Sequence, residues 1–549
     1  MPRMSTHEVF NQPPPLEGYD PLEQDRALVE GITRHEADWA MSRIRDVGVL
    51  AAGEALAWGV QANRYSPELR THDRFGHRID EVEFHPAWHR LMQASVAHGL
   101  HALPWQEPRP GAHVARAAML YLMSQAEQGH QCPITMTFAA VPALRAQPEL
   151  ADEWIPRLTS SEYDPRCIPA SQKKGALSGM AMTEKQGGSD VRANTTRARA
   201  LSNASGPGAE YEIVGHKWFC SAPMCDAFLV LAHTERGLSC FLLPRWRPDG
   251  TRNAFHIQRL KDKLGDRSNA SSEVEFQGAW ARMVGEEGRG VKTIIEMVSH
   301  TRLDCVTGSS AIMRQAVAQA THHAAHRSAF GKRLLEQPLM QNVLADLAVE
   351  QEAATLLMLR LARAYDDAPA DAGQRAFARI ATAIAKYWVC KRTPPVIAEA
   401  LECHGGAGFV EESILPRLFR QSPLNSIWEG SGNVMCLDVL RAMAREPDGV
   451  TALRTELTLA RGADRHFDAY LERLDRELSD LTDVEARGRI LVERLALALQ
   501  ASLLIRHGHP AILAAFIRSR IQGDHGTAFG TLPSGIDREA ILTRARPQI

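Results

Sequence analysis

The sequence predicts an α+β protein that is mainly helical, in which one block of strands separates two helical blocks. Its 549 residues exceed what one core usually contains, so several domains are expected. Apolar residues recur at helical spacing before residue 176 and after residue 285, whereas short β-branched and aromatic runs are confined to residues 176–285. Helix, strand and helix blocks in this order are typical of separate α and β domains.

Changes in this patterning divide the chain into five segments. Pro13-Pro14-Pro15 excludes a helix from the first segment, and Glu446-Pro447-Asp448-Gly449 is expected to be the linker before the last one. The segments are an extended arm at 1–25, an N-terminal helical domain at 26–175, a middle antiparallel β-domain at 176–285, a helical bundle at 286–445 and an additional helical domain at 446–549.

Several elements can be placed within these segments. Apolar spacing predicts a helix over His113–Glu127, and leucines at every fourth position from Leu491 to Leu503 predict an amphipathic helix in the last segment. Strands are predicted at Tyr211–Phe219, Ala227–Ala232, Ser239–Leu243 and Ser272–Phe276.

Composition restricts the class of protein and its location. The net charge of −2 gives no overall signature of a polyanion-binding protein. Nine cysteines without a C-x-x-C pair favour free thiols in a reducing compartment. No apolar run reaches the roughly 18 residues of a membrane span, and residues 1–15 lack the apolar core of a signal peptide. A cytoplasmic location without a membrane partner is therefore expected.

No metal site is predicted. His322 and His326 lie one helical turn apart, as zinc ligands do, but no acidic or cysteine ligand accompanies them in this stretch. We interpret both as part of a polar helix surface.

Two polar segments around the predicted strands suggest a cofactor site. In Met182–Asp190, two hydroxyl residues flank paired glycines that let the backbone approach a ligand closely. Taken alone, this loop would be a surface turn. Further on, Lys217–Ser221 ends a predicted strand. A flavin needs hydrogen-bond donors at its pyrimidine oxygens and at N5, and an aromatic cover for its ring. FAD is therefore expected here, and the candidate residues are Met182, Thr183, Gly188, Ser189, Trp218, Phe219 and Ser221.

These motifs resemble those of the acyl-CoA dehydrogenase family. The loop is similar to the family's T-E-x-x-x-G-S-D motif, with Lys185 in place of proline, and Trp218–Ser221 resembles its W-[IF]-[ST] turn. Ser221 falls one residue late, as if Cys220 were an extra position. Further landmarks are Lys261–Phe276, Gly285–Gly290, Arg327–Gly331 and Gly405–Phe409. The resemblance implies an N-terminal helical domain, a β-barrel-like middle domain, a C-terminal four-helix bundle and bound FAD.

The resemblance also implies an oligomer. In the family, the positions of Arg327, Phe330, Gly405 and Gly406 belong to FAD bound mainly by a neighbouring subunit, so a homotetramer or dimer is expected. The alternative for the glycines is an ordinary helix C-cap and turn.

A catalytic base is expected at Glu429. Removing the proton α to a thioester carbonyl needs a positioned carboxylate whose pKa burial raises. Glu429 lies between Trp428 and Gly430, where the family has Y-E-G, and the bulkier indole is expected to narrow the acyl channel. The alternative for Glu429 is a solvated carboxylate that stabilises the N-terminus of the next helix. The resemblance assigns Trp428, Gly430, Ser431 and Asn433 to the cofactor.

A second position for the base is excluded by residue type. One branch of the family carries its base on a helix just before an arginine, and here that position is Thr301, which cannot serve. Arg302 is expected to orient Glu429 or the flavin edge, and its alternative is an ordinary helix-face arginine.

The chain most resembles the AidB-type branch, the family's representatives in the bacterial adaptive response to DNA alkylation. Val9–Pro13, Phe84–His89, Cys132–Phe138 and Asn425–Asn433 carry this resemblance. It implies double-stranded DNA as a partner, with at most weak isovaleryl-type acyl-CoA dehydrogenation. The DNA contacts are expected at Arg441, Arg518 and Arg520.

Charge alone leaves these arginines open to a plainer interpretation. On charge alone, a solvated helix face in an arginine-rich chain is the preferred interpretation of the C-terminal arginines. Two other functions also stay open: an ordinary acyl-CoA dehydrogenase with an oligomerisation tail, and an oxidase that passes electrons from a small-molecule or acyl-CoA substrate to oxygen.

Overall fold

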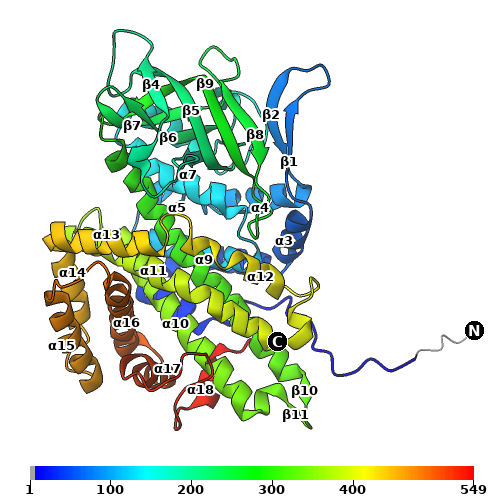
Figure 1. Ribbon diagram of the computed structural model, residues 1–549. Coiled ribbons are helices and arrows are strands. Elements are labelled where there is room, and N and C mark those ends of the chain that lie inside the picture. The colour runs from blue at the N-terminus through cyan, green and yellow to red at the C-terminus, as the bar shows by residue number, and fades with distance from the viewer. Residues whose placement is uncertain (1–5, 549) are drawn as a thin grey trace, which may run out of the picture.

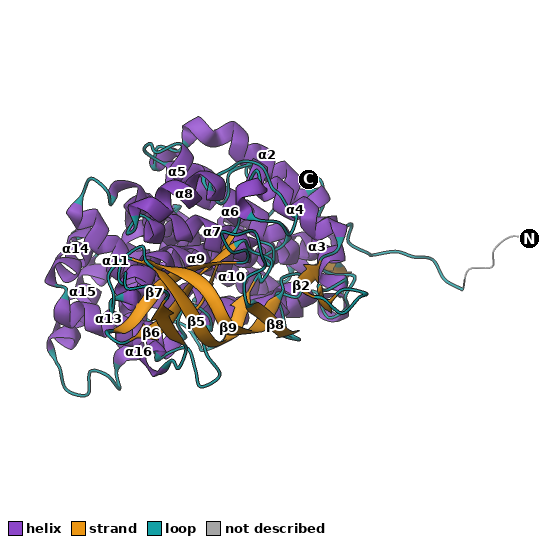
Figure 2. Cartoon of the chain, turned by 90° about the horizontal axis from the view of Figure 1, so that it is seen from above, coloured by secondary structure: helices purple, strands orange, loops and turns teal. Residues whose placement is uncertain are grey.

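The computed structural model describes residues 6–548 and places a β-domain above a stack of helices (Figure 1). The first five residues of the predicted arm lie outside the described part. The rest of the arm has no helix before Arg26, as the proline run predicts. The prediction of a mainly helical α+β fold is confirmed, because helices make up most of the described chain and the large sheet is confined to its middle segment (Figure 2).

The N-terminal region packs helices around α6, which is buried along its whole length because its sequence is almost free of charge. Its helices are α1 (Arg26–Arg34), α2 (Met41–Ala52), α3 (Glu54–Arg64), α4 (Pro86–Ala97), α5 (Leu103–Gln106), α6 (Ala112–Ala126), α7 (Gln131–Leu144) and α8 (Pro148–Leu158). A hairpin of β1 (Glu68–His72) and β2 (Arg78–Glu83) interrupts them.

The middle region is a sheet that closes on itself. Its strands are β3 (Ser178–Ala181), β4 (Arg197–Ala200), β5 (Glu210–Ser221), β6 (Ala227–Thr234), β7 (Gly237–Pro244), β8 (Phe255–Leu260) and β9 (Ser271–Val284). The strands β6, β4, β5, β9 and β7 form a ring, because β7 pairs with both β9 and β6. Pairing is antiparallel except where β3 and β4 run parallel to β6.

The bundle consists of long helices whose residues are buried on most sides, as expected for central helices. Its helices are α9 (Gly290–His326), α10 (Pro338–Asp367), α11 (Ala372–Glu402), α12 (Leu415–Gln421) and α13 (Gly432–Arg445). A short hairpin of β10 (Ser328–Ala329) and β11 (Lys332–Arg333) connects α9 to α10.

The last helices pack against α10 and α11 at the lower side of the bundle (Figure 1). They are α14 (Pro447–Thr458), α15 (Arg465–Ser479), α16 (Gly488–His507), α17 (Pro510–Phe516), the π-helical turn η7 (Ile517–Ile521) and α18 (Arg538–Ala545). The leucine stripe of α16 is buried, as predicted. The predicted linker at Glu446–Gly449 is wrong, because α14 already begins at Pro447.

The final helix reaches back to the beginning of the chain. The guanidinium of Arg544 pairs with Glu30 of α1 at 2.7 Å and with Glu352 of α10 at 2.9 Å. No helix within residues 6–548 has the length and apolar character to cross a membrane.

Candidate active site

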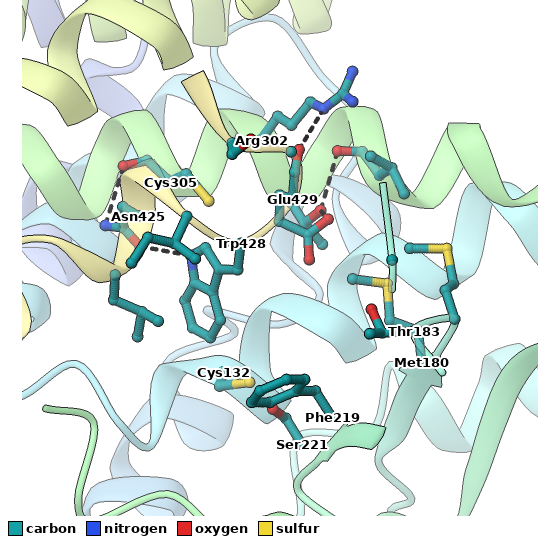
Figure 3. A pocket seen from close by; sticks show the side chains of 18 of the residues that line it. Cys132, Met180, Thr183, Phe219, Ser221, Arg302, Cys305, Asn425, Trp428 and Glu429 are labelled. Atoms are coloured by element: carbon teal, nitrogen blue, oxygen red, sulfur yellow. Dashed lines mark hydrogen bonds between the residues drawn. The ribbon is translucent and has the colours of Figure 1, made fainter. Parts of the chain in front are cut away.

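A cavity of about 940 Å³ lies where the β-domain meets the bundle. Its walls come from the loop after β3, the end of β5, the helices α7 and α9, and the segment from α12 to α13. Figure 3 shows Glu429 and Trp428 on one side of this cavity, with Thr183, Phe219 and Ser221 on the other.

The loop after β3 contributes four of the predicted residues to the cavity wall: Met182, Thr183, Gly188 and Ser189. The loop is fixed from behind by Glu184, whose side chain is fully buried. Its carboxylate accepts hydrogen bonds from the Lys217 ammonium at 2.9 Å and from the backbone N–H groups of Thr195 at 2.6 Å and Thr196 at 3.1 Å.

The end of β5 differs from the prediction. Phe219 and Ser221 line the cavity, whereas Trp218 does not. A register shift between Lys217 and Cys220 in the pairing with β9 accommodates one extra residue, so Ser221 reaches the cavity although it falls one position late. The cavity lining therefore favours Phe219 over Trp218 as the aromatic cover of a bound flavin. The Trp218 ring instead lies 3.3 Å from the Lys261 ammonium.

Glu429 lies in a tight turn between η6 (Leu424–Ser426) and α13, and its φ of +58° is in the left-handed region. Its carboxylate accepts a hydrogen bond from the Thr301 hydroxyl at 2.8 Å. Burial raises the pKa of Glu429 above its usual value, although Thr301, Arg302 and Lys386 act in the opposite direction. A carboxyl with a raised pKa in a cavity is suited to general acid–base work.

Arg302 acts on the backbone of this turn. Its Nε donates to the carbonyl oxygen of Glu429 at 3.0 Å, and its Nη1 pairs with Asp438 at 2.8 Å. The residue is 8% exposed, so it is a buried arginine between α9 and α13. We assign it a positioning role, since no hydrogen bond joins it to the Glu429 carboxylate.

Neighbours of Glu429 are placed by a second set of contacts. The indole Nε1 of Trp428 donates to Asn425 at 2.8 Å, and the Asn425 amide donates to the Cys305 carbonyl at 3.3 Å (Figure 3). The same amide donates to the Ser309 hydroxyl at 3.1 Å. Gly430 and Ser431 line the cavity with Trp428. Asn433 does not, which contradicts its prediction: its side chain accepts a hydrogen bond from Arg489 of α16 at 2.9 Å.

Four predicted cofactor residues lie away from this cavity: Arg327, Phe330, Gly405 and Gly406. Arg327 and Phe330 follow the end of α9 at the hairpin of β10 and β11 (Figure 1). Gly405 and Gly406 follow His404, whose ring lies 4.5 Å from that of His323 near the same end of α9. Phe330 is 99% exposed, and Arg327 donates to the Asn11 carbonyl of the arm at 2.6 Å. Within one chain they cannot contact a ligand in the cavity.

The three predicted DNA contacts have different surroundings. Arg441 is exposed on α13 and lines the cavity where it opens. Arg518 is partly exposed and pairs with Asp524 at 3.1 Å. Arg520 is only 7% exposed, and its guanidinium pairs with Asp346 at 2.5 Å and Glu350 at 3.2 Å. The prediction that Arg520 contacts DNA is contradicted, because its buried guanidinium already pairs with two carboxylates on α10.

Sequence reasoning missed three side chains that hold Glu429 or its neighbours: Thr301 as a hydrogen-bond donor, Asn425, and Lys386. Lys386 is a buried lysine in an otherwise apolar stretch of α11 in a chain poor in lysine, and that contrast was a usable signal. The cavity residues fit FAD. Thr183, Ser189 and Ser221 offer hydroxyl donors, Phe219 and Trp428 offer aromatic faces, and the volume lies at the upper end of the range for cofactor pockets.

Comparison with known proteins identifies the family. Residues 11–165 match the adaptive response protein AidB N-terminal domain, while 179–279 and 288–444 match the middle and C-terminal domains of acyl-CoA dehydrogenase. The chain is 48% identical over 514 residues to the putative acyl-CoA dehydrogenase AidB of Escherichia coli strain K12, covering 93% of this chain and 94% of that protein. The chain belongs to the AidB branch of the acyl-CoA dehydrogenase family.

Two solved structures are similar to this chain over nearly its whole length. The apo form of Bd2924 has a TM-score of 0.84 at 28% identity, covering 91% of this chain and all of that one. Caenorhabditis elegans ACDH-11 in complex with C11-CoA has a TM-score of 0.83 at 26% identity, covering 99% of this chain and 94% of that one. Because the match to ACDH-11 covers 99% of this chain, it includes the additional C-terminal helices.

Proposed function

We propose that this AidB-type protein binds FAD in the cavity and oxidises an acyl-CoA, with Glu429 as the base. The observation that supports this best is the carboxyl of Glu429, which faces Phe219 and Ser221 across the cavity (Figure 3). Bound FAD would supply the two-electron acceptor that this oxidation needs. The residues of the chain then have to bind and orient the substrate and to move one proton.

The proton transfer follows from the surroundings of Glu429. The ionised carboxylate takes the proton from the carbon α to the thioester, and burial favours the protonated product of this step. The Thr301 hydroxyl holds one carboxylate oxygen at 2.8 Å, which leaves the other oxygen directed to the cavity. The hydrogen bond from Arg302 to the Glu429 carbonyl fixes the position of this turn relative to α9.

The experiment that tests this role is Glu429→Gln, compared with Glu412→Gln, an exposed glutamate outside the cavity. The FAD-loaded proteins are titrated anaerobically with isovaleryl-, butyryl- and longer acyl-CoAs while flavin absorbance is followed. We expect bleaching of the parent and of Glu412→Gln, and none of Glu429→Gln with its absorbance spectrum otherwise intact. Bleaching of Glu429→Gln at the parental rate would rule out its role as base.

The same titration separates the alternative functions. Fast turnover of one acyl-CoA with an electron-transfer acceptor favours an ordinary acyl-CoA dehydrogenase, and peroxide release in air favours an oxidase. Slow bleaching by isovaleryl-CoA alone favours the AidB-type activity.

We further propose that the protein binds double-stranded DNA without sequence preference and protects it from alkylation. Support comes from membership of the AidB branch and from the exposed Arg441 at the cavity opening. Neutralising one phosphate contact lowers the slope of log affinity against log salt by about one. We expect this change for Arg441→Gln and none for Arg74→Gln, an exposed arginine in the β1–β2 turn. Equal slopes would remove Arg441 from the interface.

A homotetramer completes the proposal. The exposed Phe330 and the positions of Arg327, Gly405 and Gly406 suit contact with the cofactor of a second copy, as in the family. Sedimentation of the FAD-loaded protein tests this, and a monomer at micromolar concentration would contradict it.

A further inference from the structure

The turn that carries Glu429 has an unusual backbone. Glu429 has a φ of +58° and Gly430 a φ of +102°, so two successive residues are in the left-handed region. Glycine adopts this conformation readily, but a residue with a Cβ does so only when its surroundings enforce it. The direction of the Glu429 side chain therefore depends on whatever holds this turn.

Three carbonyl oxygens of the turn are held by two buried cations. The ammonium of Lys386 donates to the carbonyls of Trp428, at 2.7 Å, and of Gly430. Arg302 donates to the carbonyl between them, that of Glu429, at 3.0 Å. Lys386 comes from α11 and Arg302 from α9, so the turn is fixed from two helices at once.

The charge of Lys386 has no carboxylate partner within salt-bridge distance in residues 6–548, although the side chain is only 1% exposed. The other buried lysines of the described chain are paired, Lys173 with Asp226 at 2.8 Å and Lys217 with Glu184 at 2.9 Å. An unpaired buried charge is unfavourable. Lys386 is near enough to lower the pKa of the Glu429 carboxyl, so we expect ionised Glu429 to offset this charge.

Among the other charged groups around Glu429, Arg302 also lowers the pKa of this carboxyl, but unlike Lys386 it has a carboxylate partner, Asp438. Arg379 contacts Asp438 as well. Burial raises the pKa of the neighbouring thiols, so they carry no charge near neutral pH. These thiols are Cys132 on α7, Cys305 on α9 and Cys390 on α11.

We propose that Lys386 is a positioning residue that holds the Glu429 turn in its left-handed conformation and stabilises the ionised form of Glu429. This inference rests on the proposed role of Glu429 as base. It assigns to α11 a function that the neighbouring motif Trp428–Gly430 does not reveal by itself.

The test is the ionisation of Glu429, measured without turnover. Infrared difference spectra over a pH series detect a protonated carboxyl, and the band that Glu429→Gln lacks reports this residue. Lys386→Gln keeps N–H donors for the carbonyls but removes the charge, and we expect its midpoint to rise by about one pH unit. Lys386→Arg keeps the charge and should stay within a few tenths of the parent. Lys174→Gln, at the surface, is the control.

Each outcome decides the matter. An infrared midpoint of Glu429 in Lys386→Gln equal to that of the parent overturns the inference. A midpoint in Lys386→Arg that rises by about one pH unit, as expected for loss of the charge, overturns it too. The Lys386→Arg measurement therefore tests the inference even if Lys386→Gln does not fold. Failure of the proposed function is a different result. In that case Glu429→Gln bleaches with acyl-CoA at the parental rate, whatever the infrared midpoint.

Discussion

The buried pair of Glu184 and Lys217 gives the sharpest prediction, because it lies directly behind the loop that lines the cavity. Both side chains are fully buried. Burial alone would raise the pKa of Glu184, but the Lys217 ammonium and the N–H groups of Thr195 and Thr196 outweigh it and hold this pKa below its usual range. The substitution Glu184→Gln removes the charge and one acceptor oxygen while nearly preserving the shape.

The expected loss of stability follows from what the substitution leaves behind. Lys217 keeps a buried ammonium whose remaining strong acceptor is the Leu231 carbonyl at 2.8 Å. At least one backbone N–H of the loop also loses its acceptor. Breaking a buried ion pair on one side costs about 3–5 kcal/mol, so the free energy of unfolding should fall by about this amount. FAD retention should fall too, because Thr183 and Ser189 lose their support.

The assay is denaturant unfolding with parallel measurement of released flavin. The depressed pKa of Glu184 stabilises the fold above the unfolded-state pKa of about 4.3, and this contribution is lost as the pH falls. The difference between parent and Glu184→Gln should therefore shrink below about pH 4. Glu184→Gln combined with Lys217→Met should recover part of the loss. A Glu184→Gln protein as stable as the parent at pH 7 would refute the reasoning.

Three further predictions concern the site and the additional helices. Thr301→Val removes the hydrogen bond that lowers the pKa of Glu429, so the acid limb of the pH–rate profile of flavin bleaching should move to higher pH, while Thr301→Ser should keep the parental profile. Arg520→Met leaves the buried carboxylate of Asp346 without an ion-pair partner, while Glu350 keeps Arg392, and it should lower the free energy of unfolding by about 3–5 kcal/mol, with FAD absorbance unchanged in the protein that remains folded. Trp218→Phe should retain as much FAD as the parent, whereas Phe219→Ala should retain less, as measured from the 450 nm absorbance after dialysis. The reverse order would show that the Trp218 indole covers the flavin ring.

The strands that sequence could predict are those with a buried face. The four predicted strands lie within β5, β6, β7 and β9, each of which buries apolar or aromatic side chains. The hairpin of β1 and β2 was missed because Glu68–His72 and Arg78–Glu83 are mostly charged and only partly buried. Nothing in their composition separates them from a polar loop.

The errors in the predicted site arise from contacts between segments that are far apart in the sequence. Trp218 and Phe219 are equally plausible ring covers by type, and only the register shift opposite β9 decides which one faces the cavity. Arg520 looked available because charge suggests exposure, but carboxylates on α10, far away in the chain, bury it. The role of Glu429 was predicted from the residues next to it in the sequence. Lys386 lies on another helix, so those neighbouring residues could not indicate it.

The contact of Arg544 with Glu30 and Glu352 has a consequence for how the molecule comes apart. The terminal helix α18 ties α1 to α10, and Arg314 adds a hydrogen bond to the Ala545 carbonyl at 2.7 Å. The additional helices are therefore packed into the same unit as the N-terminal helices and the bundle. Amide protons of α1 and α18 should exchange with deuterium in one concerted opening, because neither helix can leave the bundle without breaking the seam shared by both.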